Sequence, residues 1–287
     1  MGSRRLVAIF SDTHAGSRLG LMPPDVVLWD EDEEGNPVAW TPKQSAVQEW
    51  LWRHYTADLE AAWTLADGDP LLLVHNGDLT QGRKYPTELV STRESDQITI
   101  AVANIARWFD RRGIQAARLI HGTGSHGFNE ATADQLVAAQ LRAMHPGRDI
   151  VTVRHGLFTV DGVLIDCAHH GPSPGIRQWT NGNQLRYYAT SLMNDELLRG
   201  RVPPRVVVRS HYHTYTRETV RVHGEHEWVT DIIVTPAYCG MNEYASQATR
   251  SAYLISCGLV VIEIVDGALR EVHALTRAVD LRREETL

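Results

Sequence analysis

Aspartate and histidine residues recur in this sequence directly after short apolar runs, in an arrangement suited to binding divalent metal ions. They fall into five blocks, Ser11-Asp12-Thr13-His14, Asn76-Gly77-Asp78, Gly124-Ser125-His126, His169-His170-Gly171 and Ser210-His211-Tyr212-His213. A carboxylate can bridge two cations, and a neutral imidazole suits manganese, iron or zinc. A calcium or magnesium site built from oxygen ligands would not need so many histidines. The blocks therefore predict a metal centre rich in imidazole ligands.

The apolar runs before the blocks have the length and composition of buried strands. They cover residues 6–10, 71–74, 116–120, 163–165 and 205–208. Asp12 and His14 are two positions apart, as are His211 and His213, so on an extended strand end each pair would project to one side. We therefore expect five strand ends to deliver their side chains to one place.

The first half of the chain alternates strand and helix patterns. Pro42 suits the first turn of a helix that has Thr41 as its N-cap and runs to about Leu65. The residues expected on its buried face are Val47, Leu51, Tyr55, Leu59 and Ala62. Further helices are predicted from Ser95 to Arg112 and from about Thr132 to Met144. This alternation indicates parallel strands with helices on the faces of the sheet.

Two segments depart from that alternation. The connection over about 15–41 is long, carries no clear periodicity and is predicted to be an insertion loop. The second half of the chain is rich in strand patterns, with hairpin turns at Asp161-Gly162 and Asp266-Gly267 and one helix from about Asn183 to Leu198. The sequence as a whole predicts an α/β fold with a hairpin-rich second half.

Composition limits the class of protein. The chain has 287 residues, enough for one large domain or two small ones, and its net charge of −7 does not suggest a surface for nonspecific nucleic-acid binding. Bound metal ions would nevertheless supply positive charge to a substrate groove. No apolar run approaches the roughly 20 residues of a membrane span, and the first ten residues lack a signal-peptide pattern. We therefore expect a cytoplasmic protein without a membrane partner. The three cysteines are odd in number and widely spaced, which argues against a disulfide framework.

The ordered blocks resemble the motifs of the calcineurin-like metallophosphoesterase superfamily over about positions 6–215. Any one block alone would be weak evidence, whereas all five in this order are specific. The segments 76–78 and 122–127 are most similar to members encoded by phages and prophages. The resemblance implies one metallophosphoesterase-like domain over 1–287, with two mixed β-sheets packed face to face and flanked by helices in a four-layer sandwich.

The resemblance also implies roles for individual residues. The first metal ion would be held by Asp12, His14 and His213, Asp78 would bridge, and His211 with His169 or His170 would hold the second ion. His169 is favoured because Gly171-Pro172 then falls where several relatives have a Gly/Pro turn. His126 would be the catalytic histidine, which gives a proton to the leaving oxygen or stabilises the transition state. The implied cofactors are two divalent ions, with Mn²⁺ as first choice and Zn²⁺, Fe or Ni²⁺ as alternatives.

Ser125 departs from the family pattern. The family has asparagine there, and its amide oxygen binds the second metal ion, whereas serine is shorter and a poorer neutral ligand. The second ion would then be held through water, be held more weakly, or recruit another group such as Asn129 or Glu130.

The activity implied is that of a metal-dependent phosphoric ester hydrolase. Phosphodiester hydrolysis in DNA, RNA or a nucleotide is preferred because His126 is retained and the relatives are phage-like, while the oligomeric state stays open. One alternative is a phosphomonoesterase acting on a nucleotide or a protein, although the arginine-bearing motifs of protein phosphatases are lacking. The other, suggested by Ser125, is a noncatalytic metal-binding scaffold with the same fold.

Overall fold

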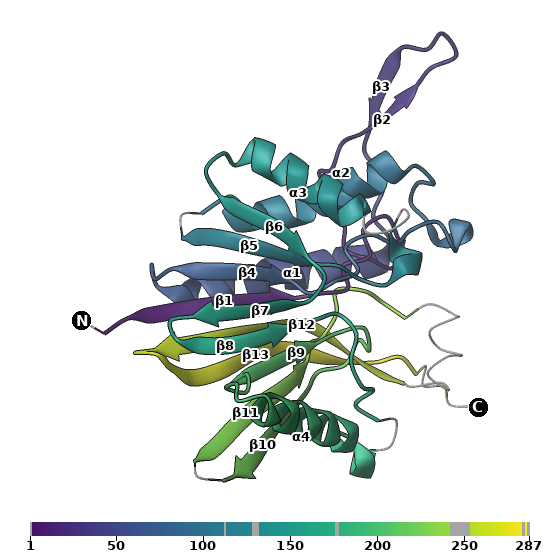
Figure 1. The fold of residues 1–287 in the computed structure, drawn as a ribbon. Coiled ribbons are helices and arrows are strands. Elements are labelled where there is room, and N and C mark those ends of the chain that lie inside the picture. Colours follow the sequence, from purple (N-terminus) through teal and green to yellow (C-terminus); the bar gives the residue numbers. More distant parts are fainter. Residues whose placement is uncertain are drawn as a thin grey trace.

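Two mixed β-sheets pack face to face in this computed structural model, and helices cover both outer faces (Figure 1). The structure describes residues 2–111, 113–127, 132–175, 178–224, 226–241, 253–282 and 285. The predicted α/β sandwich with helical outer layers is confirmed.

The larger sheet has six strands in the order β13-β12-β1-β4-β5-β6. Its strands are β1 (Arg4–Phe10), β4 (Leu71–His75), β5 (Ile114–Ile120), β6 (Asp149–Val153), β12 (Leu254–Val265) and β13 (Ala268–Asp280). Strands β1, β4, β5 and β6 are parallel, whereas β12 runs antiparallel to both of its neighbours. Parallel strands place their carboxyl ends at one edge of the sheet, so the segments that follow β1, β4 and β5 start at the same edge.

The smaller sheet has five strands in the order β10-β11-β9-β8-β7. Its strands are β7 (Gly156–Val160), β8 (Val163–Cys167), β9 (Val206–Arg209), β10 (Thr216–His223) and β11 (Glu227–Val234). Strands β8 and β9 are parallel, and hairpins add β7 and β10 at the edges. At the predicted turns, Asp161, Gly162, Asp266 and Gly267 all have positive φ, as a tight two-residue hairpin turn requires.

Four α-helices flank the sheets in the described part of the chain. Two of them begin at residues other than those predicted. Their bounds are α1 (Ala46–Ala66), α2 (Glu94–Ala106), α3 (Thr132–Met144) and α4 (Asn183–Leu198). Helix α1 does not begin at Thr41-Pro42, because Ser45 and Gln48 form a reciprocal capping box in which each side chain bonds the other's backbone N–H. Val47, in the first turn, is 37% exposed and is not part of the buried face. Helix α2 begins after Arg93 rather than at Ser95.

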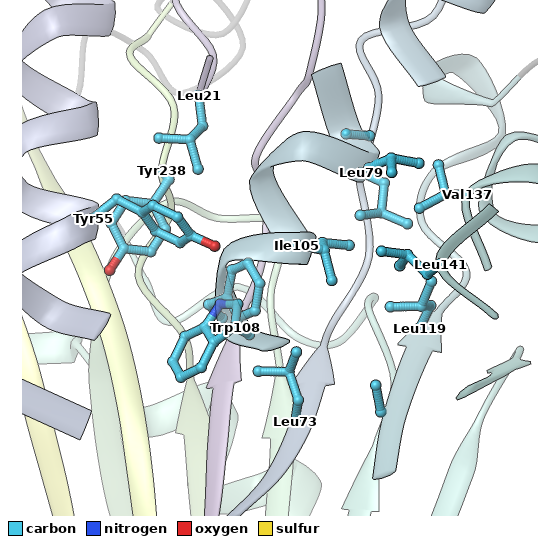
Figure 2. Packing of buried hydrophobic residues seen from close by; sticks show 14 of the residues in the cluster. Leu21, Tyr55, Leu73, Leu79, Ile105, Trp108, Leu119, Val137, Leu141 and Tyr238 are labelled. Carbon is cyan, nitrogen blue, oxygen red and sulfur yellow. The ribbon is translucent and has the colours of Figure 1, made fainter. Parts of the chain in front are cut away.

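Three apolar layers hold the sandwich together. The first lies between helices α1, α2 and α3 and the six-stranded sheet, where Trp108 is fully buried and stacks on Phe10 at 5.6 Å between ring centroids (Figure 2). The second lies between the two sheets, and the third lies between α4 and the five-stranded sheet. In the first layer the Tyr55 hydroxyl donates a hydrogen bond to the Asn104 carbonyl, and the Tyr238 hydroxyl donates one to the Asp58 carboxylate. These bonds join α1 to α2 and to the segment that follows β11.

The segment over 15–41 is more ordered than predicted. Its first part is buried beside the ligand blocks, and its second part forms a hairpin of β2 (Leu28–Glu31) and β3 (Pro37–Trp40) that stands away from the body (Figure 1). The remaining short elements are the 3-10 helices η1 (Pro86–Glu88), η2 (Arg107–Phe109), η3 (Gly124–His126) and η4 (Gln178–Thr180). No described helix combines the length and the apolar character needed to cross a membrane. The three cysteines are free and buried.

Candidate metal centre

All five predicted ligand blocks follow the carboxyl end of a strand. They come after β1, β4 and β5 of the six-stranded sheet and after β8 and β9 of the five-stranded sheet. Backbone bonds tie the blocks together: Asp12 N–H donates to the Gly77 carbonyl at 3.0 Å, His14 N–H to the Asp78 carbonyl at 3.1 Å, and Ser210 N–H to the His169 carbonyl at 2.9 Å. The blocks therefore form one cluster at the edge shared by both sheets.

The backbone at five of the seven predicted ligands has positive φ and is not extended. Positive φ angles occur at Asp12 (52°), His14 (42°), Asp78 (54°), His211 (76°) and His213 (51°). The expected extended geometry of the Asp12-x-His14 and His211-x-His213 pairs is therefore wrong. Residues with a Cβ are rarely found in this region, and its cost is tolerated mainly at functional sites. In this chain the five positions all belong to the blocks that follow strand ends.

The first candidate group consists of Asp12, His14 and His213. The His213 Nε2 atom lies 3.3 Å from Asp12 Oδ1, and the His14 Nε2 atom lies 3.8 Å from the same oxygen. His14 Nε2 is also 4.0 Å from Asp78 Oδ2. The potential ligand atoms of the three residues all lie within 4.8 Å of one another, a spacing that one divalent ion could span with modest adjustment.

The second candidate group surrounds Asp78. His169 Nε2 lies 3.0 Å and His211 Nδ1 lies 3.9 Å from Asp78 Oδ2. His169 Nε2 is also 3.9 Å from Asp12 Oδ1. The two carboxylates thus lie between the two groups of imidazoles, which is the position a bridging ligand must occupy.

The electrostatics of the cluster favour ionised carboxylates. Burial alone would raise the pKa of Asp12 and Asp78, yet the surrounding histidines, His169 above all, hold both pKa values well below their usual range. Burial opposes the protonation of His169, but Asp78 and Asp12 outweigh it and raise the pKa of His169 to about 9. Two buried anions therefore attract positive charge strongly.

Several buried polar atoms in the cluster lack a hydrogen-bond partner within the described residues. They are Asp12 Oδ1 and both ring nitrogens of His14, whereas His169 Nε2 lies against the Asp78 carboxylate at 3.0 Å. Buried polar atoms are nearly always paired, so a group of neighbouring buried atoms without hydrogen-bond partners requires an explanation. Carboxylate and imidazole atoms are the donors that a divalent transition metal prefers. The residues present therefore fit two such ions.

The predicted catalytic residue His126 lies at the rim of the same cluster. Its Nδ1 atom donates a hydrogen bond to the Gln81 carbonyl at 2.8 Å, and its Nε2 atom is 4.0 Å from Asp78 Oδ2. Burial, followed by the proximity of His14, lowers the pKa of His126 to about 4. In the free protein the ring is therefore neutral, with its Nε2 lone pair turned toward the cluster.

Neighbouring residues orient the ligands. The Asn76 carbonyl accepts a bond from His169 Nδ1 at 2.7 Å, which leaves Nε2 to face Asp78. The side-chain amide of Asn76 donates to the Ala168 carbonyl and to the Ser210 hydroxyl, so it joins three blocks. His75 is fully buried and lies 3.1 Å from the Thr13 hydroxyl. These contacts fix the loops before any ion binds.

Two glycines and one threonine of the site lie in the motifs quoted from the sequence but were given no role there. A methyl group on Gly122 would overlap the carboxylate and backbone of Asp78, and one on Gly77 would overlap the ring of His169. The Thr123 backbone N–H donates to Asp78 Oδ1 at 2.6 Å, and its hydroxyl donates to Oδ2 at 3.2 Å. Their place in the motifs was a signal, but their contacts with Asp78 and His169 depend on distant parts of the chain.

The remaining candidate ligands differ in their burial and in their contacts. His169 is 1% exposed at the centre of the cluster, whereas the neighbouring His170 is an exposed residue at its rim. Ser125 lies in η3, and its hydroxyl makes no hydrogen bond to Asp78, His169 or His211 in the described part of the chain. Asn129 and Glu130 lie outside the described residues.

Comparison with known proteins gives little beyond a distant structural similarity. No known family profile matches this chain, and no curated protein sequence does. Among solved structures, the chain is similar to the sulfate thiohydrolase SoxB of Thermus thermophilus, solved in complex with glycerol, at 12% sequence identity and a TM-score of 0.37. The similarity covers 96% of this chain and 56% of SoxB, so the chain spans little more than half the length of that protein. The function proposed below therefore rests on the chain's own side chains.

Proposed function

We propose that this protein is a metal-dependent phosphoesterase with a two-ion centre, and that its substrate is a phosphodiester of a nucleic acid or a nucleotide. The observation that carries this proposal is the pair of buried carboxylates, Asp12 and Asp78, set between imidazoles; one of these, His14, has no hydrogen-bond partner for either ring nitrogen within the described residues. The motif order that resembles metallophosphoesterases supports it independently.

Each residue would have a distinct task. Asp12, His14 and His213 would hold one ion, His169 and His211 would hold the other, and Asp78 would bridge. Bound divalent ions would lower the pKa of a water to about 7 and neutralise phosphate charge. The carboxylates draw the ions in, and the carbonyl of Asn76 keeps the His169 ring in its binding orientation. The histidine-rich donor set suits Mn²⁺, Fe, Zn²⁺ or Ni²⁺.

His126 would act on the ester itself. Its Nδ1 is fixed by the Gln81 carbonyl, so its Nε2 is the atom free to contact the substrate. The ring is neutral in the free protein, so it would have to take up a proton at Nε2, which a bound phosphate anion would favour, before it could donate that proton to the leaving oxygen. A general acid of this kind contributes about 10² to 10⁴ in rate. His126 Nε2 lies 4.0 Å from Asp78 Oδ2. A phosphate group bound beside the metal ligands would therefore be close to this nitrogen.

A screen of activity across metals and substrates tests the proposal. Metal-free protein is reconstituted with Mn²⁺, Zn²⁺, Fe²⁺, Ni²⁺ or Mg²⁺ and assayed on chromogenic phosphodiesters and phosphomonoesters, single- and double-stranded DNA, RNA and small nucleotides. Turnover of diesters that requires a transition metal and is lost in Asp78→Asn supports the proposal. Turnover of monoesters alone would reassign the substrate class.

A noncatalytic metal-binding scaffold is the second candidate, and Ser125 is the observation that favours it. If the second ion lacks a complete ligand set, the protein would bind one ion and hydrolyse nothing. One ion per chain and no turnover with any of these metals would establish the scaffold and exclude the phosphoesterase.

A further inference from the structure

Three histidine rings converge on one side of Asp78. The potential ligand atoms of His169, His170 and His211 all lie within 4.8 Å of one another. The ring centroid of His170 is 4.9 Å from that of His169 and 4.8 Å from that of His211. His169 and His211 also belong to the group around Asp78, so His170 adds a third imidazole to a pair already placed there.

The His170 ring is exposed, yet its Nε2 atom faces inward. Nε2 lies 3.5 Å from the Thr123 hydroxyl, which is 3.4 Å from His211 Nδ1 and 3.2 Å from Asp78 Oδ2. The Thr123 hydroxyl thus lies near three side chains, Asp78, His211 and His170, that would also lie around a metal ion. A surface histidine without a role would have no reason to direct its ring nitrogen at this point.

Ser125 leaves a ligand position to be filled. Asp78, His169 and His211 supply three donors for the second ion, and the serine hydroxyl bonds to none of them in the described part of the chain. The Thr123 hydroxyl is already engaged by the Asp78 carboxylate. Among neutral donors near this point, an imidazole is a better ligand for zinc, nickel or iron than a hydroxyl group.

We propose that His170 is the fourth protein ligand of the second ion and replaces the amide that Ser125 lacks. This inference rests on the proposed two-ion centre. Ligand atoms about 2.1 Å from a tetrahedral ion are about 3.4 Å apart, and Asp78 Oδ2 already lies 3.0 Å from His169 Nε2 and 3.9 Å from His211 Nδ1. The His170 ring is exposed and would reach the ion by a side-chain rotation. A site with three imidazoles and one carboxylate favours Zn²⁺, Ni²⁺ or Co²⁺ over Mg²⁺.

Metal binding, measured without any substrate, tests the inference. Metal-free wild type, His170→Ala, Ser125→Ala and the double variant Ser125→Asn with His170→Ala are titrated with Co²⁺ and followed by visible absorption. Bound Zn²⁺ is then counted by mass spectrometry after gel filtration. His170 is exposed, so its variant should fold, and circular dichroism with a melting curve checks this.

We expect two ions per chain in wild type and in the matched control Ser125→Ala. In His170→Ala the second ion should bind at least about 100-fold more weakly, since loss of a residue that merely orients a ligand already costs 10- to 100-fold. The change should weaken the cobalt absorption of that site. Asparagine at position 125 should restore the second ion in the double variant, because its amide reaches the position that serine leaves open.

Three outcomes would overturn the inference: two ions with unchanged affinity in His170→Ala, loss of an ion in Ser125→Ala, or a single ion in wild type. Failure of the proposed function looks different. In that case wild type binds two ions, and His170→Ala loses one, but no phosphate ester is hydrolysed with any metal.

Discussion

His169 Nε2 lies 3.0 Å from Asp78 Oδ2, the shortest carboxylate–imidazole distance in the candidate metal centre. Asp78 follows β4 of the six-stranded sheet, and His169 follows β8 of the five-stranded sheet. The pair therefore joins the two sheets at the edge where their parallel strands end. An ion bound there would add a further link between two layers that meet mainly through apolar side chains and through polar bonds such as that from Asn76 to Ser210.

Metal binding should accordingly stabilise the fold. A ligand that binds only the folded state at 100 times its dissociation constant adds about 2.7 kcal/mol to the free energy of unfolding. We expect the melting temperature to rise when Zn²⁺ or Mn²⁺ is added to metal-free protein and to fall again with a chelator. Asp78→Asn should remove most of this rise in calorimetry. A melting temperature that does not respond to any divalent metal would argue against the centre.

His126→Ala should retain metal and lose turnover. The ring contacts the Gln81 carbonyl through Nδ1 and presents Nε2 to the substrate side, so its loss should lower kcat by about 10² to 10⁴. Metal content and kcat on a model phosphodiester are measured together, with His155→Ala, which pairs with Asp166 instead, as the control. An unchanged rate would show that the role given to His126 is wrong, and a lost ion would make it a ligand.

Gly122→Ala should abolish metal binding at Asp78, whereas Gly124→Ala should not. A methyl group at Gly122 meets the Asp78 carboxylate and backbone, while one at Gly124 meets nothing within 4 Å. The two glycines are neighbours in one loop, so the comparison isolates the steric effect. Metal content after reconstitution is the measurement. Equal metal content in both variants would mean that the loop adapts.

Arg277→Met should destabilise the fold without affecting the site. Arg277 forms two bonds, of 2.6 and 2.8 Å, to Asp58, which is buried on α1 and 2% exposed. Without Arg277 the carboxylate keeps, among the residues that the structure describes, only the Tyr238 hydroxyl as a partner. We expect the free energy of unfolding, measured with urea, to fall by about 2–4 kcal/mol. The upper part of this range overlaps the cost of removing one partner of a buried ion pair. Arg282→Met, which breaks an exposed pair with Asp280, should cause no measurable loss.

Asp231 should make stability depend on pH below neutrality. Burial opposes its ionisation, but the Thr219 hydroxyl and the Arg205 and Arg217 guanidinium groups hold its pKa below the usual value. A lowered folded pKa contributes stability above the unfolded pKa, and this contribution is lost as the pH falls through the folded pKa. Asp231→Asn should therefore be less stable at pH 7 and lose less on acidification to pH 3. Equal slopes of unfolding free energy against pH in wild type and variant would refute this prediction.

Local patterns predicted elements whose signals lie within a few residues. The structure has α3 and α4 at the predicted bounds, and the Asp161-Gly162 and Asp266-Gly267 turns follow from residues that accept positive φ. The start of α1 was wrong because the Ser45–Gln48 capping box competes with the equally plausible Thr41-Pro42 signal. The hairpin of β2 and β3 was missed because its alternation of side chains is short and interrupted by acidic residues.

The candidate site could be predicted in residue type but not in geometry. Motif order identified the blocks, yet no local rule predicts that Asp12 and His14 are left-handed or that Thr123 lies between Asp78 and His170. These features arise from contacts between distant strands, such as the bond from Asp12 N–H to the Gly77 carbonyl. The assignment of individual ligands stays a prediction until ions are counted.

The left-handed backbone at five aspartate and histidine positions has a conformational cost that the rest of the fold must offset. Glycine at His14 or His213 would remove that cost, but it would also remove an imidazole that stabilises the ionised form of the buried Asp12 carboxylate. Strain and buried charge are therefore coupled at this edge of the sandwich, and relieving the first at either histidine leaves the second less well compensated.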